Sequence, residues 1–293
     1  MRKKILRKIK SGCDLSQAFP GCEGATPIHF AVEFGVKSSG TMVDLGSNIT
    51  PLYWASSFRA DDVAKILIEA GADVNAQSSF KYTPLHNAAQ SGSMPTLQML
   101  LKANANVNVK STQTGRTPLH LAAQNGETKA VEALLNIEGI EINPVANGGD
   151  TPLMLAVLQG HRRIVEILLQ NGANPNKTDD KDRTPLFVAA VGNQDKIIEL
   201  LVEHGGHVNT VCGDGKKTPL FYATSTNNMS LALLLLRLGA DANICHGSKR
   251  CKTNNNVGVE QQTVQCYSQE RFIPNRMLYS GRCHLKCKEC GRL

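Results

Sequence analysis

The sequence predicts an all-α fold of stacked helix-turn-helix pairs, and two observations support that prediction. A Thr-Pro dipeptide occurs seven times, at successive intervals of 24, 33, 34, 34, 33 and 34 residues. The full intervals contain two stretches with apolar residues at helical spacing, and most of these stretches end at a glycine. A period of this length is typical of a stacked repeat array rather than of a chain with one central core.

The first helix of each repeat is expected to begin at the Thr-Pro pair. Threonine can cap a helix through its hydroxyl, and proline suits the first helical turn, as at Thr117 and Pro118. Ala122 and Ala123 follow at helical spacing, and their small side chains let neighbouring helices approach closely. Gly126 stands nine residues after Thr117 and is expected to end this helix.

A denser apolar stripe marks the second helix of each repeat, and in one repeat it consists of Ile164, Val165, Ile167, Leu168 and Leu169. Gly172 is expected to stop this helix, 21 residues after Thr151. Asn104 takes the same place in another repeat and tolerates a left-handed backbone. An extended link and a polar turn then lead to the next Thr-Pro pair.

These residues resemble the ankyrin repeat family, because Thr-Pro-Leu-His, Ala-Ala, Gly, Leu-Leu and Gly-Ala-Asp-Val-Asn stand in register. The resemblance covers about residues 5–244. It implies an ankyrin-repeat solenoid of antiparallel helix pairs joined by β-hairpin-like loops, each stabilised mainly by its neighbours. We expect repeats to start near Thr26, Thr50, Thr83, Thr117, Thr151, Thr184 and Thr218, the first of them incomplete.

The expected organisation has three parts. Residues 1–24 are interpreted as an N-terminal half-repeat or cap, with a membrane-surface helix, a nuclear-import signal or a truncated start as alternatives. Residues 25–244 form the array, and residues 245–293 form a basic, cysteine-rich tail that we expect to be disordered. The net charge of +7 comes from the two ends, since residues 11–244 carry −5, which disfavours a basic nucleic-acid-binding domain.

Sequence patterns also exclude several classes of protein. No apolar run is long enough to span a membrane, and the basic N-terminus lacks the apolar segment of a secretion signal. We therefore expect a cytoplasmic or nuclear location. The sequence contains no phosphate-binding Gly-x-x-x-x-Gly-Lys, no His-Glu-x-x-His and no Gly-x-Ser-x-Gly motif, so a non-catalytic protein is expected.

The histidines have structural interpretations. His29, His86 and His120 are the histidines of Thr-Pro-x-His, and the family resemblance implies that each bonds the threonine hydroxyl and nearby backbone. Where another residue stands there, apolar packing is expected to replace that bond, at Tyr53, Met154, Phe187 and Phe221. His204 and His207 have a ligand-like spacing, but they lie across a helix-ending turn, so we favour a solvated loop over a metal site.

The tail contains the one candidate metal site. Cys287 and Cys290 form a Cys-x-x-Cys pair, and Cys283 or His284, together with Cys266 or Cys251, would have to complete a zinc site. A second such pair is missing, so a disordered basic tail without metal is favoured, and redox or disulfide chemistry is the third possibility. We expect no other cofactor.

The family resemblance implies a scaffold or adaptor that binds a protein partner through the hairpin tips and the concave face of the first helices. These exposed positions lie one, three and four residues before each threonine and seven and eight after it. The candidate partner-binding residues are Phe80, Tyr82, Gln90, Ser91, Gln113, Arg116, Gln124, Asn125, Asp150, Gln159, Arg183 and Lys217. Phe80, Tyr82 and Arg116 are the expected anchors, because aromatic and arginine side chains dominate binding energies.

Two alternative functions and one modification remain open. The chain could recruit substrates to a ubiquitin ligase or another enzyme complex, although residues 245–293 show no leucine-rich box of the kind some ankyrin proteins use. The tail could instead make a zinc-stabilised contact with nucleic acid. The resemblance also suggests that an asparaginyl hydroxylase could modify Asn75, eight residues after Leu67.

Overall fold

A computed structural model of the chain describes residues 49–213 and 217–244. These residues belong to two compact units, which divide between Asp180 and Lys181. Within the described residues, regular structure is helical apart from one isolated antiparallel bridge between Cys212 and Lys217. The expected all-α fold class is therefore confirmed, and the expected starts at Thr26 and the N-terminal cap lie outside the described residues.

Helices come in pairs that match the sequence period. The described part of the first unit contains α3 (Pro51–Ser57) with α4 (Asp61–Glu69), α5 (Pro84–Ser91) with α6 (Met94–Lys102), α7 (Pro118–Asn125) with α8 (Thr128–Leu135), and α9 (Pro152–Leu158) with α10 (Arg162–Gln170). The described part of the second unit contains α11 (Pro185–Val191) with α12 (Asp195–Glu203) and α13 (Pro219–Ser225) with α14 (Met229–Arg237).

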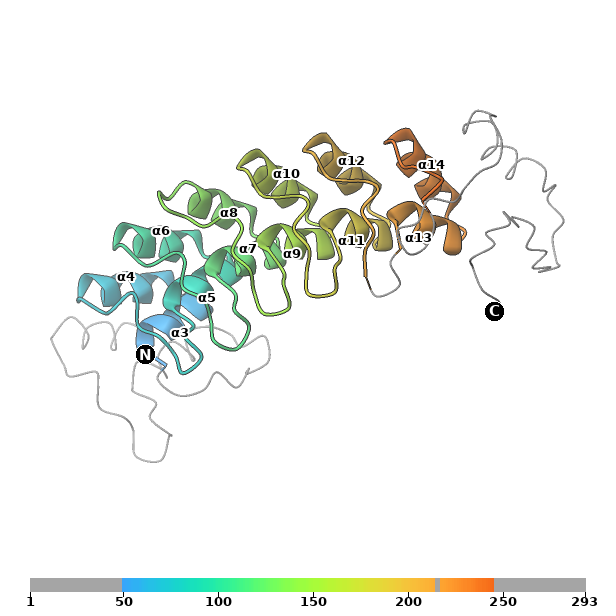
Figure 1. Cartoon of the computed structure of the whole chain (residues 1–293). Helices are drawn as coiled ribbons and strands as arrows, with labels where there is room; N and C mark the ends of the chain where they lie inside the picture. Colours follow the sequence, from blue (N-terminus) through green and yellow to red (C-terminus); the bar gives the residue numbers. More distant parts are fainter. Residues whose placement is uncertain (1–48, 214–216, 245–293) are drawn as a thin grey trace, which may run out of the picture. The chain divides into compact units, whose positions relative to one another are not determined.

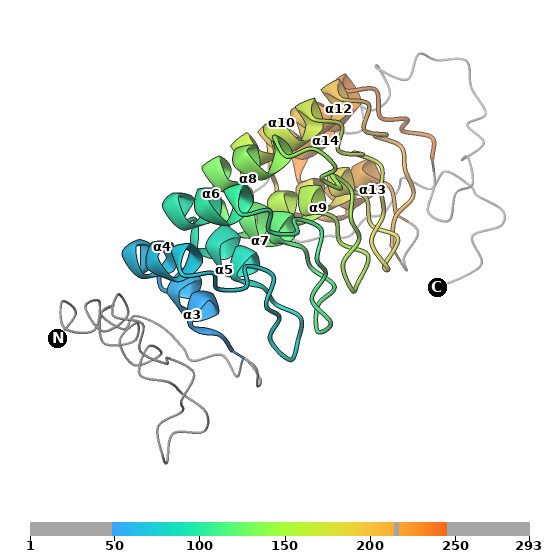
Figure 2. The same cartoon turned by 90° about the vertical axis from the view of Figure 1, so that its left-hand side faces the viewer.

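Within the first unit the pairs stack in two layers (Figures 1 and 2). The first helices form one layer, in which α3 contacts α5, α5 contacts α7 and α7 contacts α9. The second helices form the other, in which α4 contacts α6, α6 contacts α8 and α8 contacts α10. In the second unit α11 contacts both α12 and α13, and α13 contacts α14. Every described pair thus packs against a neighbouring pair, as a repeat array requires.

Threonine caps begin all six first helices of the described residues, and a proline follows each cap. Where a histidine stands three residues later, as at His86, its Nδ1 lies 3.1 Å from the Thr83 backbone nitrogen and 2.9 Å from the Thr83 hydroxyl. Where the histidine is replaced, as at Met154, the threonine hydroxyl still accepts from the backbone nitrogen, here at 3.2 Å. Replacement of the histidine therefore removes the bonds of its ring and keeps the threonine cap.

The two described capping histidines also tie each repeat to the next. His86 Nε2 lies 3.2 Å from the carbonyl oxygen of Arg116, and His120 Nε2 lies 3.1 Å from that of Asp150. Because a carbonyl only accepts, Nε2 carries the proton and the ring is neutral with Nδ1 as an acceptor. Burial lowers the pKa of both histidines to about 4, which is consistent with this neutral form.

Leucine and alanine side chains fill the space between the layers. Leu85, Leu97, Leu119 and Leu134 are fully buried, and burial of one such side chain stabilises a fold by about 1.5–3 kcal/mol. The alanine pairs of α5 and α7 are equally buried. Their small side chains let the first helices lie close together, as their spacing in the sequence predicts.

The loops before the first helices have the hairpin-like form that the family resemblance implies. The Ser78 backbone nitrogen donates to the Tyr82 carbonyl at 2.9 Å, and Ser111 donates to Arg116 at the same distance. Adjacent hairpin tips are joined as well, because the Thr112 nitrogen donates to the carbonyl of Phe80 at 2.9 Å. Each tip is therefore held by its own repeat and by the next one.

Candidate functional site

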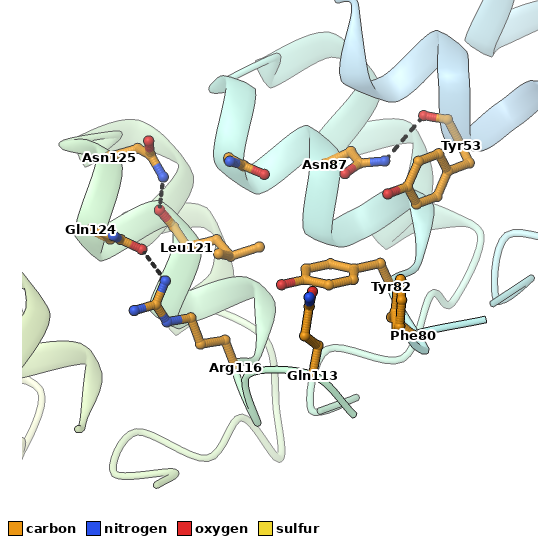
Figure 3. A pocket seen from close by; sticks show the side chains of 10 residues that line it. Tyr53, Phe80, Tyr82, Asn87, Gln113, Arg116, Leu121, Gln124 and Asn125 are labelled. Carbon is orange, nitrogen blue, oxygen red and sulfur yellow. Dashed lines mark hydrogen bonds between the residues drawn. The ribbon is translucent and has the colours of Figure 1, made fainter. Parts of the chain in front are cut away.

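A hollow of about 230 Å³ lies in the first unit, between α3, α5, α7 and two neighbouring hairpins (Figure 3). Side chains from three consecutive repeats line it: Tyr53, Phe80, Tyr82, Asn87, Gln90, Gln113, Arg116, Leu121, Gln124 and Asn125. Three of these side chains are aromatic rings, five are amides, one is leucine, and the only charged one is Arg116.

Tyr82 is the central aromatic side chain of the hollow (Figure 3). It stands directly before the capping Thr83, so the start of α5 fixes its backbone. Its hydroxyl lies 3.2 Å from the Thr114 hydroxyl on the next hairpin, and its ring meets the His86 ring edge-on at a centroid distance of 5.3 Å. These contacts hold the ring in one orientation between two repeats.

Arg116 reaches the hollow from the second hairpin and points toward the end of α7 (Figure 3). Its Nη1 donates to the side-chain oxygen of Gln124 at 2.7 Å. The Gln124 backbone carbonyl in turn accepts from His161 Nε2 at 3.1 Å, and the carbonyl of Arg116 accepts from His86. Both the backbone and the guanidinium group of Arg116 are therefore positioned, while the bond to the neutral Gln124 amide leaves its charge intact.

The wall formed by the first helices is largely buried. Tyr53 is 2% exposed, and its carbonyl accepts from the Asn87 side-chain nitrogen at 3.2 Å. Burial raises the pKa of the Tyr53 hydroxyl, so the phenol stays neutral at physiological pH. On α7, the Asn125 side-chain nitrogen donates to the Leu121 carbonyl at 2.8 Å. This wall offers amides and rings but no ionised group.

The structure brings seven of the twelve candidate partner-binding residues together around this hollow: Phe80, Tyr82, Gln90, Gln113, Arg116, Gln124 and Asn125. Ser91, Asp150 and Gln159 lie elsewhere in the first unit, and the Ser91 hydroxyl donates to the Ser56 carbonyl at 3.2 Å. Arg183 and Lys217 lie in the second unit, where Lys217 Nζ is 5.9 Å from the Phe221 ring centre. That any of the twelve binds a partner stays a prediction.

Three lining residues were missing from the candidate set: Tyr53, Asn87 and Leu121. Asn87 and Leu121 stand four residues after their capping threonines. That position is one helical turn before the exposed position eight residues after the threonine, so both lie on the same helix face. Helical periodicity could have found these two. Tyr53, three residues after its threonine, was interpreted only as packing.

The hollow is suited to hydrogen bonding and stacking rather than to acid–base chemistry, because its lining contains no Asp, Glu, His or Cys. Throughout the described residues, no three His, Cys, Asp or Glu side chains lie close enough to hold a metal ion. His204 and His207 are both exposed. The same part of the chain contains no helix with the length and apolar character that crossing a bilayer requires.

The remaining candidate sites have different positions. Cys283, Cys287 and Cys290 lie outside the described residues, so the zinc site stays a prediction. Asn75 is exposed in the first unit, and its side-chain oxygen accepts from the Asn106 backbone nitrogen at 2.8 Å. Its hydroxylation also stays a prediction, which a search for an added oxygen by mass analysis of the protein from cells can test.

Comparisons with known proteins agree with the helix-pair architecture. A family model described as ankyrin repeats in three copies matches residues 36–111, 85–179 and 153–245. The chain is similar to the neurogenic locus Notch protein of Drosophila melanogaster, with 40% identity over 77 residues, which is 26% of this chain and 3% of that protein. An ankyrin repeat protein of Rickettsia bellii is 32% identical over 77 residues, 26% of this chain and 32% of that protein.

The ankyrin repeat and SOCS box protein 11 of Mus musculus is 32% identical over 98 residues, which is 30% of each chain. The chain thus spans 32% or less of the length of these three relatives. The family model covers well over half of the sequence, and its copies follow the helix pairs that the structure describes. The chain belongs to the ankyrin repeat family.

Proposed function

We propose that the protein is a non-catalytic scaffold or adaptor that binds a protein partner through the first unit, with the hollow between Tyr82 and Arg116 at the centre of the contact. Ankyrin repeats generally mediate protein–protein interaction. The observation that carries the proposal is the convergence of seven candidate residues from two repeats on one hollow.

The chemistry of the hollow supports this function. Tyr82 and Arg116 are held by neighbouring groups before any partner arrives, so binding costs little side-chain entropy. Aromatic and arginine side chains of this kind account for most of the energy of typical protein interfaces. The lining lacks the acids, bases and nucleophiles that a catalytic site needs.

The experiment is affinity purification with the whole chain, followed by partner identification and measurement of the dissociation constant. Tyr82→Ala and Arg116→Ala are each expected to weaken binding by ~1–2 kcal/mol, or roughly 5- to 30-fold. Lys129→Ala is the control, because Lys129 is exposed on α8 in the layer of second helices. It is expected to bind as the unchanged chain does.

Equal binding by all four chains would move the partner site away from the hollow. A chain that captures no protein partner under any condition, and instead turns over a substrate, would refute the scaffold function itself.

A second candidate is recruitment of substrates to a ubiquitin ligase or another enzyme complex. The similarity to a mouse protein named for ankyrin repeats and a SOCS box favours it, although the matched segment covers only 30% of either chain. If the protein has this function, the affinity purification is expected to capture ligase subunits that bind residues outside the array. A purification in which residues 1–244 retain every partner of the whole chain would argue against a recruiting tail.

A further inference from the structure

The hollow that the proposed function uses has a marked charge bias. Residues 74–126 contain Lys81, Lys102, Lys110 and Arg116 but no Asp or Glu, in a chain that has 25 acidic residues. This segment includes both hairpins of the hollow and all of α5, α6 and α7. A carboxylate that enters the hollow therefore meets positive charge and no acidic side chain of these elements.

Arg116 is the group in the lining that can bind such a carboxylate. Gln124 takes one N–H of its guanidinium group, which has five N–H donors, and no carboxylate lies within ion-pair distance of it among the described residues. Two parallel N–H donors of an arginine match the two oxygens of a carboxylate. The bond to Gln124 fixes the guanidinium group without neutralising it.

Next to this cation the hollow offers an apolar surface and amides. Phe80 and Tyr82 are half-buried and stand on the hairpin adjacent to that of Arg116. Gln90, Gln113 and Asn125 are exposed at the rim. Side-chain amides both donate and accept, so they suit the unpaired N–H and C=O groups of an extended peptide backbone.

The volume of the hollow limits the size of the group that it can bind. A hollow of about 230 Å³ is smaller than the ~300–1,000 Å³ of typical small-molecule and cofactor sites. It has room for one or two side chains of a segment that lies across it. A single lining cation also argues against nucleic acid, whose binding depends on several phosphate contacts.

We propose that the hollow binds an extended peptide segment of the partner, with an Asp or Glu carboxylate on Arg116 and a neighbouring apolar side chain against Phe80 and Tyr82. This inference rests on the proposed function and names the chemistry of its partner.

The test begins with selection of peptides from a random library displayed on phage, with the whole chain as bait. The selected peptides are expected to be rich in Asp or Glu next to an apolar residue. One labelled peptide and its Glu→Gln counterpart are then titrated with the unchanged chain and with Arg116→Gln, with binding read by fluorescence anisotropy. Each single change is expected to weaken binding by about tenfold or more, and the second change is expected to add little to the first.

Arg162→Gln is the matched control. Arg162 is exposed on α10, in the layer of second helices of the first unit, and its replacement removes the same charge from a residue that does not line the hollow. Its chain is expected to bind the acidic peptide unchanged. Arg116→Lys keeps the charge without the paired donors. Its affinity for the acidic peptide is expected to lie between those of the unchanged chain and of Arg116→Gln. Thermal unfolding of each variant shows whether it is folded.

Selection of neutral peptides, or equal binding of the acidic peptide by Arg116→Gln, overturns this inference. Tighter binding of a single-stranded oligonucleotide than of the acidic peptide overturns it as well. The proposed function is tested separately. If capture of a partner depends on Tyr82 but not on Arg116, the scaffold function stands and only the inference of a carboxylate on Arg116 is overturned.

Discussion

His86 donates from Nε2 to the carbonyl oxygen of Arg116, 3.2 Å away in the next repeat. The capping histidine of one helix therefore fixes the backbone of the residue that carries the only charge in the hollow. The neutral form of this histidine matters for the fold and for the site alike, because every ring nitrogen already has a partner in that form.

Acidification should destabilise the first unit through its capping histidines. Folding lowers the pKa of His86 and His120 from about 6.5 to about 4, so the unfolded chain binds more protons between these two values. The contribution of these histidines to the free energy of unfolding is therefore fully present above the pKa of the unfolded chain. It falls as the pH drops, by at most ~1.4 kcal/mol per pH unit for each histidine.

Denaturant unfolding between about pH 5 and 6.5 measures this slope. Trp54 is the only tryptophan of the chain and lies in α3, so its fluorescence reports on the first unit. His120→Met, which places the residue of the next repeat at this position, should reduce the slope. An identical slope in this variant would show that other groups cause the dependence.

Two adjacent glycines should differ in their tolerance of alanine. Gly148 and Gly149 both have a left-handed backbone, with φ of 97° and 80°, so each substitution is strained by ~1–2 kcal/mol. A Cβ at Gly149 would also lie 2.4 Å from the Asp180 backbone nitrogen, whereas a Cβ at Gly148 meets nothing closer than 3.9 Å.

Gly149→Ala is therefore expected to destabilise the first unit by ~1–3 kcal/mol more than Gly148→Ala, measured by denaturant unfolding. Equal losses would mean that the loop around Asp180 moves aside at no cost.

Two aspartates that each begin a second helix should contribute differently to the free energy of unfolding. Asp61 begins α4, where its side-chain oxygen accepts from the hydroxyls of Ser93 and Thr96, both buried. Asp195 begins α12, where one of its buried side-chain oxygens has no hydrogen-bond partner among the described residues.

Asp61→Ala leaves two buried hydroxyls without their acceptor and is expected to cost ~1–3 kcal/mol. Asp195→Ala removes an unsatisfied acceptor, so its cost should stay below ~0.5 kcal/mol. Thermal unfolding followed by circular dichroism compares the two, and a larger loss for Asp195→Ala would contradict the argument.

The Asn108 side chain should stabilise the stack more than an asparagine side chain that bonds only locally. Its side-chain oxygen accepts from the Glu141 nitrogen at 3.0 Å, and its nitrogen donates to the Gly139 carbonyl at 2.8 Å. Asn174, by contrast, accepts from the Asn176 nitrogen two residues away.

Asn108→Ala is expected to cost ~1–2 kcal/mol and to speed hydrogen exchange at the Glu141 amide. The control Asn174→Ala should leave that amide unchanged. Unaltered exchange in Asn108→Ala would mean that the bonds between these repeats do not protect the turn.

The elements predicted most accurately from the sequence are those set by local chemistry. Thr117 caps α7 and Gly126 ends it with a φ of 81°, as their positions predict, because capping and helix termination involve residues within a few positions of each other. Asn104 takes the predicted left-handed conformation for the same reason, with a φ of 58°. The period of the Thr-Pro pairs then determined that these helices stack as an ankyrin array.

Tertiary structure decided which side chains of different repeats meet. Tyr53, Tyr82 and Arg116 come from three repeats, and only their packing places them around one hollow. The repeat period places Arg183 before Thr184 as Arg116 is placed before Thr117, but it does not show which side chains either arginine contacts. The bond from Arg116 to the Gln124 side chain and the bond from His161 to the Gln124 carbonyl orient Arg116 at the hollow. Such side-chain contacts depend on side-chain orientation, which a periodic pattern does not encode.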